Sequence, residues 1–200
     1  MPYIVRLPQV RKIAAALIGS VLLAVVVPAA AAAACPSSAT SKPFAQFGDN
    51  AAYTLVQGGT FESNAAGWLL SNSAVTRESG VPAGGSHSLA IQPTGVVVSP
   101  SFCVNIAEPS FRFFLRQISG SWAVLNVILR WADSSGVSHD TTVAALQTGT
   151  AWTPSPVLQL ATTLPLTTST STISAKLVFK PEQYGGAWAI DDVYVDPHSR

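Results

Sequence analysis

Short apolar runs with alternating polar positions follow one another along the chain from residue 53 onward. In residues 122–131, one set of alternate positions is apolar, and the other set contains Trp122, Asn126 and Arg130. Successive side chains of a strand point to opposite faces of its sheet, so this alternation predicts strands with one buried face. After Cys35 no window keeps the apolar period of about 3.6 residues that an amphipathic helix needs. The pattern therefore predicts an all-β chain.

Glycine and proline, 14 of each, separate these runs. Both residue types favour turns, so their spacing is typical of short strands joined by turns. We expect strands at 53–57, 67–70, 88–92, 111–117, 122–131, 138–146, 173–180 and 188–195. This many strands in one domain predicts a two-sheet antiparallel β-sandwich of the jelly-roll type.

The N-terminal segment has the pattern of a secretory signal peptide. Three basic residues precede an apolar run over Ile13–Val27, and a string of small residues ends at Ala34. We therefore expect a cleaved signal peptide at 1–34, a single β-sandwich domain at 35–200 and a secreted protein without membrane contact after cleavage. The alternative is a retained membrane helix over Ile13–Ala34, which is long enough to span a bilayer.

The two cysteines, Cys35 and Cys103, both remain after cleavage. In an exported chain two cysteines most simply form one disulfide, and closing a loop of this length would stabilise the fold by about 4 kcal/mol. Lipid attachment at Cys35 is an alternative, although Ala32 occupies the position that usually holds leucine in that signal. A zinc site needs about four clustered ligands, which these cysteines and three scattered histidines do not provide.

The charge balance excludes one class of partner. Eight basic and ten acidic residues remain after cleavage, which gives a formal net charge of −2. Nucleic-acid-binding domains present a basic surplus, so we expect no nucleic acid partner.

Three short motifs stand in order along the chain. Gly58–Glu62 is followed by Gly67–Trp68, then by Gly-Ser-His-Ser-Leu-Ala-Ile at 85–91 and Trp-Ala-Ile-Asp-Asp-Val-Tyr-Val at 188–195. This set resembles carbohydrate-binding modules of the family 4, 9 and 22 type, over about residues 53–196. The resemblance implies a galactose-binding-like jelly roll that binds a polysaccharide or other glycan without catalysis. The ending Asp-Asp-Val-Tyr-Val-Asp-Pro is also similar to that of a group of secreted actinobacterial proteins.

The same resemblance implies a structural Ca²⁺ ion that joins the first motif to the last strand. Carried over by motif, its ligands are Glu62 and the pair Asp191 and Asp192. Ca²⁺ prefers about six to eight oxygen ligands, so backbone carbonyls of the glycine-rich turns would complete the shell. Adjacent strand residues point to opposite faces, so we expect one of the two aspartates to bind, and the family position favours Asp191. The alternative is a pair of surface carboxylates at a strand end.

A candidate ligand face follows from the strand alternation. If 111–117 and 122–131 are neighbouring strands joined by a turn at 119–121, one face carries Arg112, Arg116, Asn126 and Arg130, with Trp122 beside them. Only 10% of the chain is charged, which makes three arginines on one face notable. A guanidinium group fits planar carboxylates, so this face predicts a glycan that carries acidic groups. The alternative is an ordinary solvated sheet face.

Motifs of catalysis are missing from the sequence. It contains no Gly-x-Ser-x-Gly, no His-Glu-x-x-His and no phosphate loop. A glycosidase needs two carboxyl groups about 5 to 10 Å apart around one bond, and the side chains of Asp191 and Asp192 diverge. We therefore expect a non-catalytic glycan-binding module. The alternative is an extracellular structural or protein-interaction domain that keeps the scaffold without binding sugar.

Overall fold

The computed structural model describes residues 39–78, 85–105, 110–160, 163–166, 172–183 and 186–196. These residues belong to one compact unit, Cys35–Arg200. The expected signal peptide, its cleavage site and Cys35 lie outside the described residues, so the cleavage and the disulfide stay predictions. Cys103 lies in a short strand opposite Ser174.

The described chain is almost entirely β-structure, as expected, and every strand pair is antiparallel. Its elements are β1 Thr40–Ser41, the 3₁₀ helix η1 Ala45–Phe47, β2 Tyr53–Leu55, β3 Leu69–Thr76, β4 Ser88–Val98, β5 Phe102–Val104, β6 Ser110–Gln117, β7 Leu125–Ala132, β8 Ser138–Leu146, β9 Thr153–Pro154, β10 Leu158–Gln159, β11 Ile173–Pro181 and β12 Trp188–Asp196. Each of the eight expected segments contains a strand, and the four short strands β1, β5, β9 and β10 were not predicted. Within the described residues, no helix has the length and hydropathy needed to cross a membrane.

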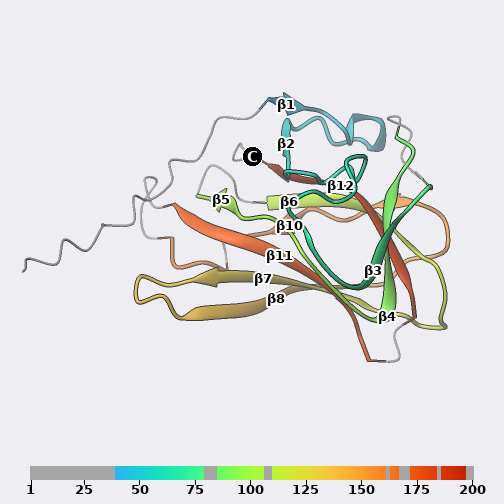
Figure 1. The fold of residues 1–200 in the computed structure, drawn as a ribbon. Helices are drawn as coiled ribbons and strands as arrows, with labels where there is room; N and C mark the ends of the chain where they lie inside the picture. Colours follow the sequence, from blue (N-terminus) through green and yellow to red (C-terminus); the bar gives the residue numbers. More distant parts are fainter. Residues whose placement is uncertain are drawn as a thin grey trace, which may run out of the picture. The chain divides into compact units, whose positions relative to one another are not determined.

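The strands form two layers (Figure 1). In the first, which we call sheet I, β12 pairs with β6, and β2, β9 and β10 extend the layer. In the second, sheet II, β11 pairs with β7 and β5, and β8 pairs with the outer side of β7. This arrangement confirms the antiparallel β-sandwich.

The β3–β4 hairpin belongs to both layers. Leu89, Ala90 and Ile91 of β4 pair with β12, whereas Val97 and Val98 pair with β11. The hairpin therefore bends between its two halves, and Figure 1 shows both strands passing from one layer to the other. Glycine is required at this bend, because a Cβ atom on Gly95 would lie 2.7 Å from the carbonyl oxygen of Asn72.

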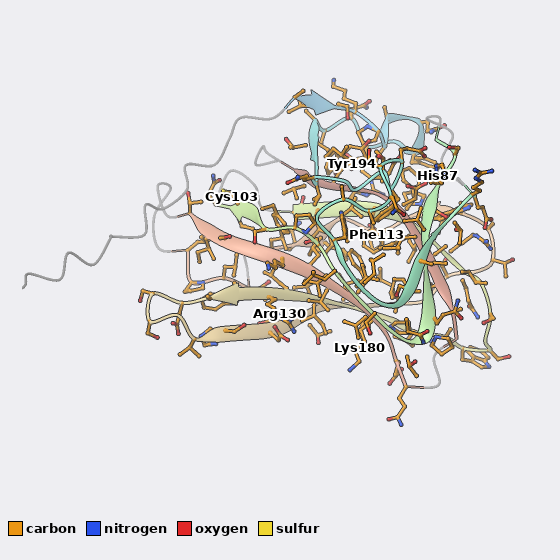
Figure 2. The ribbon with its side chains drawn as sticks, in the orientation of Figure 1. His87, Cys103, Phe113, Arg130, Lys180 and Tyr194 are labelled. Carbon is orange, nitrogen blue, oxygen red and sulfur yellow. The ribbon has the colours of Figure 1, made fainter. Side chains whose placement is uncertain are left out.

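The core lies between the layers and follows the predicted alternation. Its buried side chains include Phe111, Phe113 and Leu115 of β6, Leu125, Val127 and Leu129 of β7, Leu177 and Phe179 of β11, and Trp188 and Ile190 of β12. The rings of Phe113 and Phe179 meet edge to face at 5.0 Å and so connect sheet I with sheet II (Figure 2).

A second, aromatic cluster covers part of the outer face of sheet I. Phe44 precedes η1 and is fully buried against Tyr53, Phe114 and Tyr194, with ring centroids 5.0 to 5.8 Å apart. Trp152 packs against the same cluster. The segment from Phe44 to Asp49 thus shields part of this face from solvent.

The central ring contact provides a test of the layered core. We expect Phe113→Ala to lower the free energy of unfolding by about 3 to 5 kcal/mol, because it leaves a cavity between the sheets. As a control, Leu69→Ala removes a side chain that is 64% exposed and should change it by less than about 0.5 kcal/mol. Urea unfolding measures both, and similar losses in the two variants would contradict this core.

Candidate functional site

Strand β12 contains a β-bulge at the two aspartates of the last motif. Asp191 stands opposite Phe114 and Tyr194 stands opposite Arg112, so β12 has one residue more than β6 over this stretch. Asp192 has a φ of 48°, in the left-handed region. Ile190 and Val193 consequently both lie in the core, which strict alternation forbids. The regular alternation expected for a strand at 188–195 is therefore interrupted at the two aspartates.

The bulge places the two aspartates in different surroundings. Asp191 is buried, and its Oδ1 accepts the N–H of Asp192 at 2.8 Å. Asp192 is 9% exposed, and no hydrogen bond reaches its carboxylate from the described residues. Burial, with a further contribution from the charge of Glu62, raises the pKa of Asp192 to about 6. Glu62 therefore acts electrostatically on Asp192, whereas the family position favoured Asp191.

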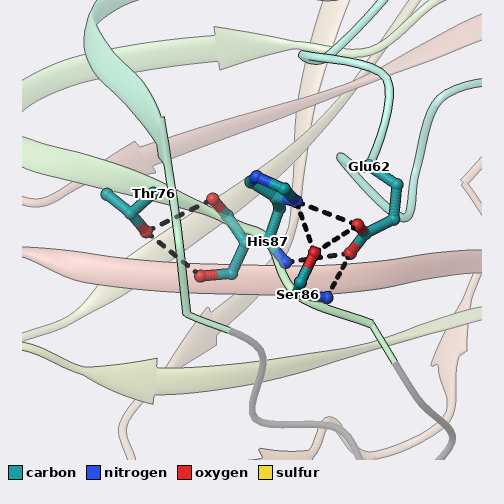
Figure 3. A network of polar contacts seen from close by, with 5 residues as sticks. Glu62, Thr76, Ser86 and His87 are labelled. Carbon is teal, nitrogen blue, oxygen red and sulfur yellow. Dashed lines mark hydrogen bonds and ion pairs between the residues drawn. The ribbon is translucent and has the colours of Figure 1, made fainter.

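Glu62 connects the loop of the first motif to the start of β4 (Figure 3). Its Oε1 accepts the backbone N–H groups of Ser86 at 2.6 Å and His87 at 2.9 Å. Its Oε2 contacts Ser86 Oγ and His87 Nδ1, both at 2.9 Å. These bonds, above all the one to the His87 side chain, lower the pKa of Glu62 to about 2. The first two motifs of the sequence thus meet in one polar network.

The network combines a serine, a histidine and a glutamate, but its geometry is not that of a catalytic triad. His87 Nδ1 lies 2.8 Å from Ser86 Oγ and 2.9 Å from Glu62 Oε2. In a triad one ring nitrogen contacts the nucleophile and the other contacts the carboxylate. Because a single nitrogen contacts both groups here, the histidine cannot relay a proton between them. We assign no catalytic group to this network.

The three arginines do not share a face, because β6 lies in sheet I and β7 lies in sheet II. The prediction that these two strands are neighbours in one sheet is wrong, because the turn between them carries the chain from one layer to the other. Arg112 and Arg116 are therefore separated from Asn126 and Arg130.

Arg112 is a buried structural residue of sheet I. Its Nη1 bonds to Asp49 Oδ2 at 2.7 Å, and its Nε and Nη2 both donate to the carbonyl oxygen of Ser155, at 2.9 and 2.7 Å. The guanidinium carbon lies 4.4 Å from the centroid of the Phe44 ring. These contacts hold the segment from Phe44 to Asp49 against the sheet. Because Arg112 is buried, it does not contribute to a ligand surface.

Arg116 lies nearer the surface of the same sheet. Its Nη2 pairs with Glu78 at 2.5 Å, and its guanidinium carbon lies 5.6 Å from the centroid of the Trp152 ring. Both Arg116 Nε and Trp152 Nε1 are buried without a hydrogen-bond partner in the described part of the chain. We assign this pair no ligand.

The outer face of sheet II carries the remaining predicted residues together with two lysines. Across the β7–β11 ladder, Arg130 stands opposite Lys176, Ile128 opposite Val178 and Asn126 opposite Lys180. We call these six residues the sheet II face; Figure 2 labels Arg130 and Lys180 on it. The two lysines were not proposed as site residues, although they occupy the polar positions of 173–180. Their signal was present in the alternation of that segment.

The cations of the sheet II face differ in their partners. Arg130 makes a two-point contact with Asp140, from Nε to Oδ1 and from Nη2 to Oδ2, both at 2.7 Å. Within the described chain, Lys176 and Lys180 form no ion pair with a carboxylate. The face therefore presents two cations that are free to meet an anionic ligand.

Trp122 lies beyond one end of this face, in the turn that joins the layers. It is 89% exposed and has a φ of 59°. The turn is held by bonds from the N–H groups of Ile118 and Ser119 to the carbonyl oxygen of Ala187, at 2.7 and 3.2 Å. An exposed indole on a fixed turn presents a large apolar surface for stacking.

At the other end of the sheet II face lies a pocket of about 690 Å³. It is lined by residues where β7 ends and where β8 and β11 begin, among them Arg130, Trp131, Asp133, Ser138, Ser174 and Lys176. Apart from Arg130, the sequence did not predict this pocket, because its lining comes from three separate parts of the chain, namely Ser101, residues 130–138 and residues 165–176.

No protein-family model matches the chain, and no curated protein matches it. Solved structures do. The CBM22-1 xylan-binding domain of Paenibacillus barcinonensis Xyn10C is 18% identical, with a TM-score of 0.50, over 69% of this chain and 90% of that one. The CBM22-1–CBM22-2 tandem of the same protein is 16% identical, with a TM-score of 0.52, over 82% of this chain and 46% of that one.

A third similar structure contains the CBM22-1 and GH10 modules of Clostridium thermocellum Xyn10B in complex with xylohexaose. It is 14% identical, with a TM-score of 0.54, over 71% of this chain and 28% of that one. The chain thus spans less than half of each of the two longer proteins. These likenesses establish the fold: the domain has the β-sandwich jelly roll of these solved carbohydrate-binding modules, which agrees with the resemblance drawn from the motifs.

Asp192 predicts a pH dependence of stability in the presence of a chelator. Its folded-state pKa of about 6 exceeds the ordinary value of 3.8. The folded chain therefore holds a proton that the unfolded chain has lost, and stability falls as pH rises from about 4 to 6. Asp192→Asn removes this loss and should raise the free energy of unfolding at pH 7.5 by about 2 kcal/mol. Asparagine tolerates the left-handed backbone, so the substitution adds little strain.

The measurement is urea unfolding of the wild type and Asp192→Asn at several pH values between about 4 and 8, and the difference between the two proteins isolates the contribution of Asp192. Parallel stability profiles for the wild type and Asp192→Asn would contradict the assignment of this dependence to Asp192.

Proposed function

We propose that the domain is a secreted, non-catalytic module that binds a glycan along the sheet II face. The observation that carries this proposal is the group of exposed or partly exposed polar side chains on the outer side of sheet II, namely Lys176, Lys180, Arg130 and Asn126. Amide, ammonium and guanidinium groups donate hydrogen bonds to sugar oxygens. The predicted signal peptide and disulfide support an extracellular location.

The similar solved structures support a polysaccharide as the partner. One is described as a xylan-binding domain and another is a complex with xylohexaose. This support is at the level of the fold, and the choice of ligand depends on the residues of this chain.

The charges of the sheet II face favour a glycan with acidic groups. Asp140 pairs with Arg130, which leaves Lys176 and Lys180 as an unbalanced positive charge. Between the lysines, the half-buried Ile128 offers a small apolar surface on which the C–H face of a sugar ring can pack, whereas Val178 beside it is only 2% exposed. Exposed ion pairs contribute little individually and are screened by salt, so we expect binding that uses several of them and weakens as ionic strength rises. Trp122 would offer a further stacking surface.

The first test is a comparison of polysaccharides. We expect the protein to bind an acidic polymer such as polygalacturonate more tightly than neutral polymers, as measured by calorimetry at low ionic strength. Lys180→Ala and Asn126→Ala should each weaken that binding about three- to tenfold, which corresponds to about 0.6 to 1.4 kcal/mol.

Lys42→Ala is the matched control, because Lys42 is an exposed lysine near β1 in sheet I. It should leave the affinity unchanged. Equal effects of Lys42→Ala and Lys180→Ala would show that binding follows net charge rather than this face. A glycan array without any bound sugar would instead favour an extracellular protein-interaction domain.

We also propose a structural Ca²⁺ ion between Glu62 and Asp192. The Asp192 carboxylate, which receives no hydrogen bond from the described residues, supports this, because a bound cation would both coordinate it and offset the charge of Glu62. No three Asp, Glu, His or Cys side chains of the described chain stand close enough to hold an ion together, so backbone carbonyls must contribute. Glu62 would have to give up one of its four hydrogen bonds.

This proposal predicts a calcium-dependent melting temperature. Millimolar Ca²⁺ should raise it by about 5 °C or more relative to EDTA, as expected for an ion in about hundredfold excess over its Kd. Asp192→Asn should abolish the rise, and Asp140→Asn, which removes an exposed carboxylate elsewhere, should retain it. Identical melting temperatures of the wild type in Ca²⁺ and EDTA would contradict the site.

A further inference from the structure

The pocket at the end of the sheet II face has walls from three segments. Ser101 follows β4, Asp133 and Ser138 flank the β7–β8 turn, and Pro165 and Thr172 precede β11. Its volume of about 690 Å³ lies in the range of small-ligand pockets. Arg130 and Lys176 belong both to the pocket and to the open face, so a chain lying along the face would lead into it.

Of the two cations in the pocket, Arg130 is paired with Asp140, and Lys176 is the one without a carboxylate partner in the described part of the chain. Arg130 uses Nε and Nη2 on Asp140, which leaves the two N–H bonds of Nη1 available.

The one carboxylate among the pocket's lining residues does not compete for these cations. Asp133 Oδ1 accepts bonds from Ser135 N at 2.9 Å, Ser135 Oγ at 2.6 Å and Val137 N at 3.0 Å. Its Oδ2 contacts His139 Nε2 at 2.8 Å. These bonds hold the carboxylate within its own turn, and because they lower its pKa it stays ionised there.

The remaining lining groups suit a sugar ring. Hydroxyl groups come from Ser101, Ser134, Ser138, Thr172 and Ser174, and none of them bonds to another described residue. Trp131 contributes an apolar wall, and its ring is held by stacking on His139, with centroids 4.5 Å apart and an interplanar angle of 22°. A ligand that combines several hydroxyl groups, an apolar ring face and a negative charge matches this set.

We propose that the pocket binds the terminal residue of a glycan chain when that residue carries a carboxylate, as a uronic acid does. Lys176 and the free side of Arg130 meet the carboxylate, the serine and threonine hydroxyls meet the ring hydroxyls, and Trp131 packs against the ring. This inference rests on the proposed glycan function, and it adds recognition of the chain end to recognition along the chain.

The experiment uses free monosaccharides, which occupy the pocket without needing the open face. Nuclear magnetic resonance titration should show glucuronate or galacturonate binding with shifts at Trp131 and Ser138, and at least tenfold weaker binding of glucose and galactose. Lys176→Ala should weaken uronate binding at least tenfold, and Ser174→Phe, which fills the pocket, should abolish it. Lys42→Ala is the unchanged control, and melting temperatures confirm that each variant is folded.

The two proposals fail differently. If an acidic polymer binds but free uronates do not, or if Lys176→Ala and Ser174→Phe bind uronates as the wild type does, the pocket proposal is overturned and binding along the face stands. If neither polymer nor monosaccharide binds, the glycan function itself fails. Uronate binding that Ser174→Phe abolishes supports the pocket.

Discussion

The pairing of β12 fixes how the two ends of the domain and both of its layers are arranged. On one side this strand pairs with β6 from Trp188 to Asp196. On its other side it pairs first with β4, over Trp188–Ile190, and then with β2, at Tyr194 and Val195. The change of partner from β4 to β2 occurs at the bulge, where β12 has one extra residue and Val193 stays in the core. The loop of the first motif then runs beside Val193, whose carbonyl oxygen accepts the N–H of Val56 at 2.9 Å. The bulge that joins these segments is also what buries Asp192 within electrostatic reach of Glu62.

The same pairing decides which surface is left for a ligand. Because β12 holds β6 in sheet I, the side chains of Arg112 and Arg116 lie on a face that the aromatic cluster around Phe44 partly covers. Strand β7 pairs with β11 and β8 instead, and the outer side of that ladder leaves Lys180 exposed and Asn126, Arg130 and Lys176 partly exposed. Lysines that lack carboxylate partners in the described chain lie there. The arginines of the two layers therefore differ in role: Arg112 in sheet I holds the structure together, whereas we propose that Arg130 in sheet II binds the ligand.

The sequence predicts local features well and long-range pairing poorly. Alternation located eight strands and the buried parity of β6, β7 and β11, because it depends on neighbours in the chain. The turn at 119–121 indicated that the chain reverses, but a turn does not reveal whether the next strand joins the same sheet. The bulge had a signal: apolar positions change phase between Ile190 and Val193, and strict alternation overlooked it. The pocket needs three loops to be placed in space, which no local pattern provides.

We propose that the ligand surface is the outer side of sheet II. A map of backbone amide shifts in the isotope-labelled protein, recorded during titration with an acidic oligosaccharide, tests this assignment. We expect the largest changes to cluster at Asn126, Arg130, Lys176 and Lys180, while β6 and the aromatic cluster remain unchanged. Largest changes along β6, around Arg112 and Arg116, would contradict it.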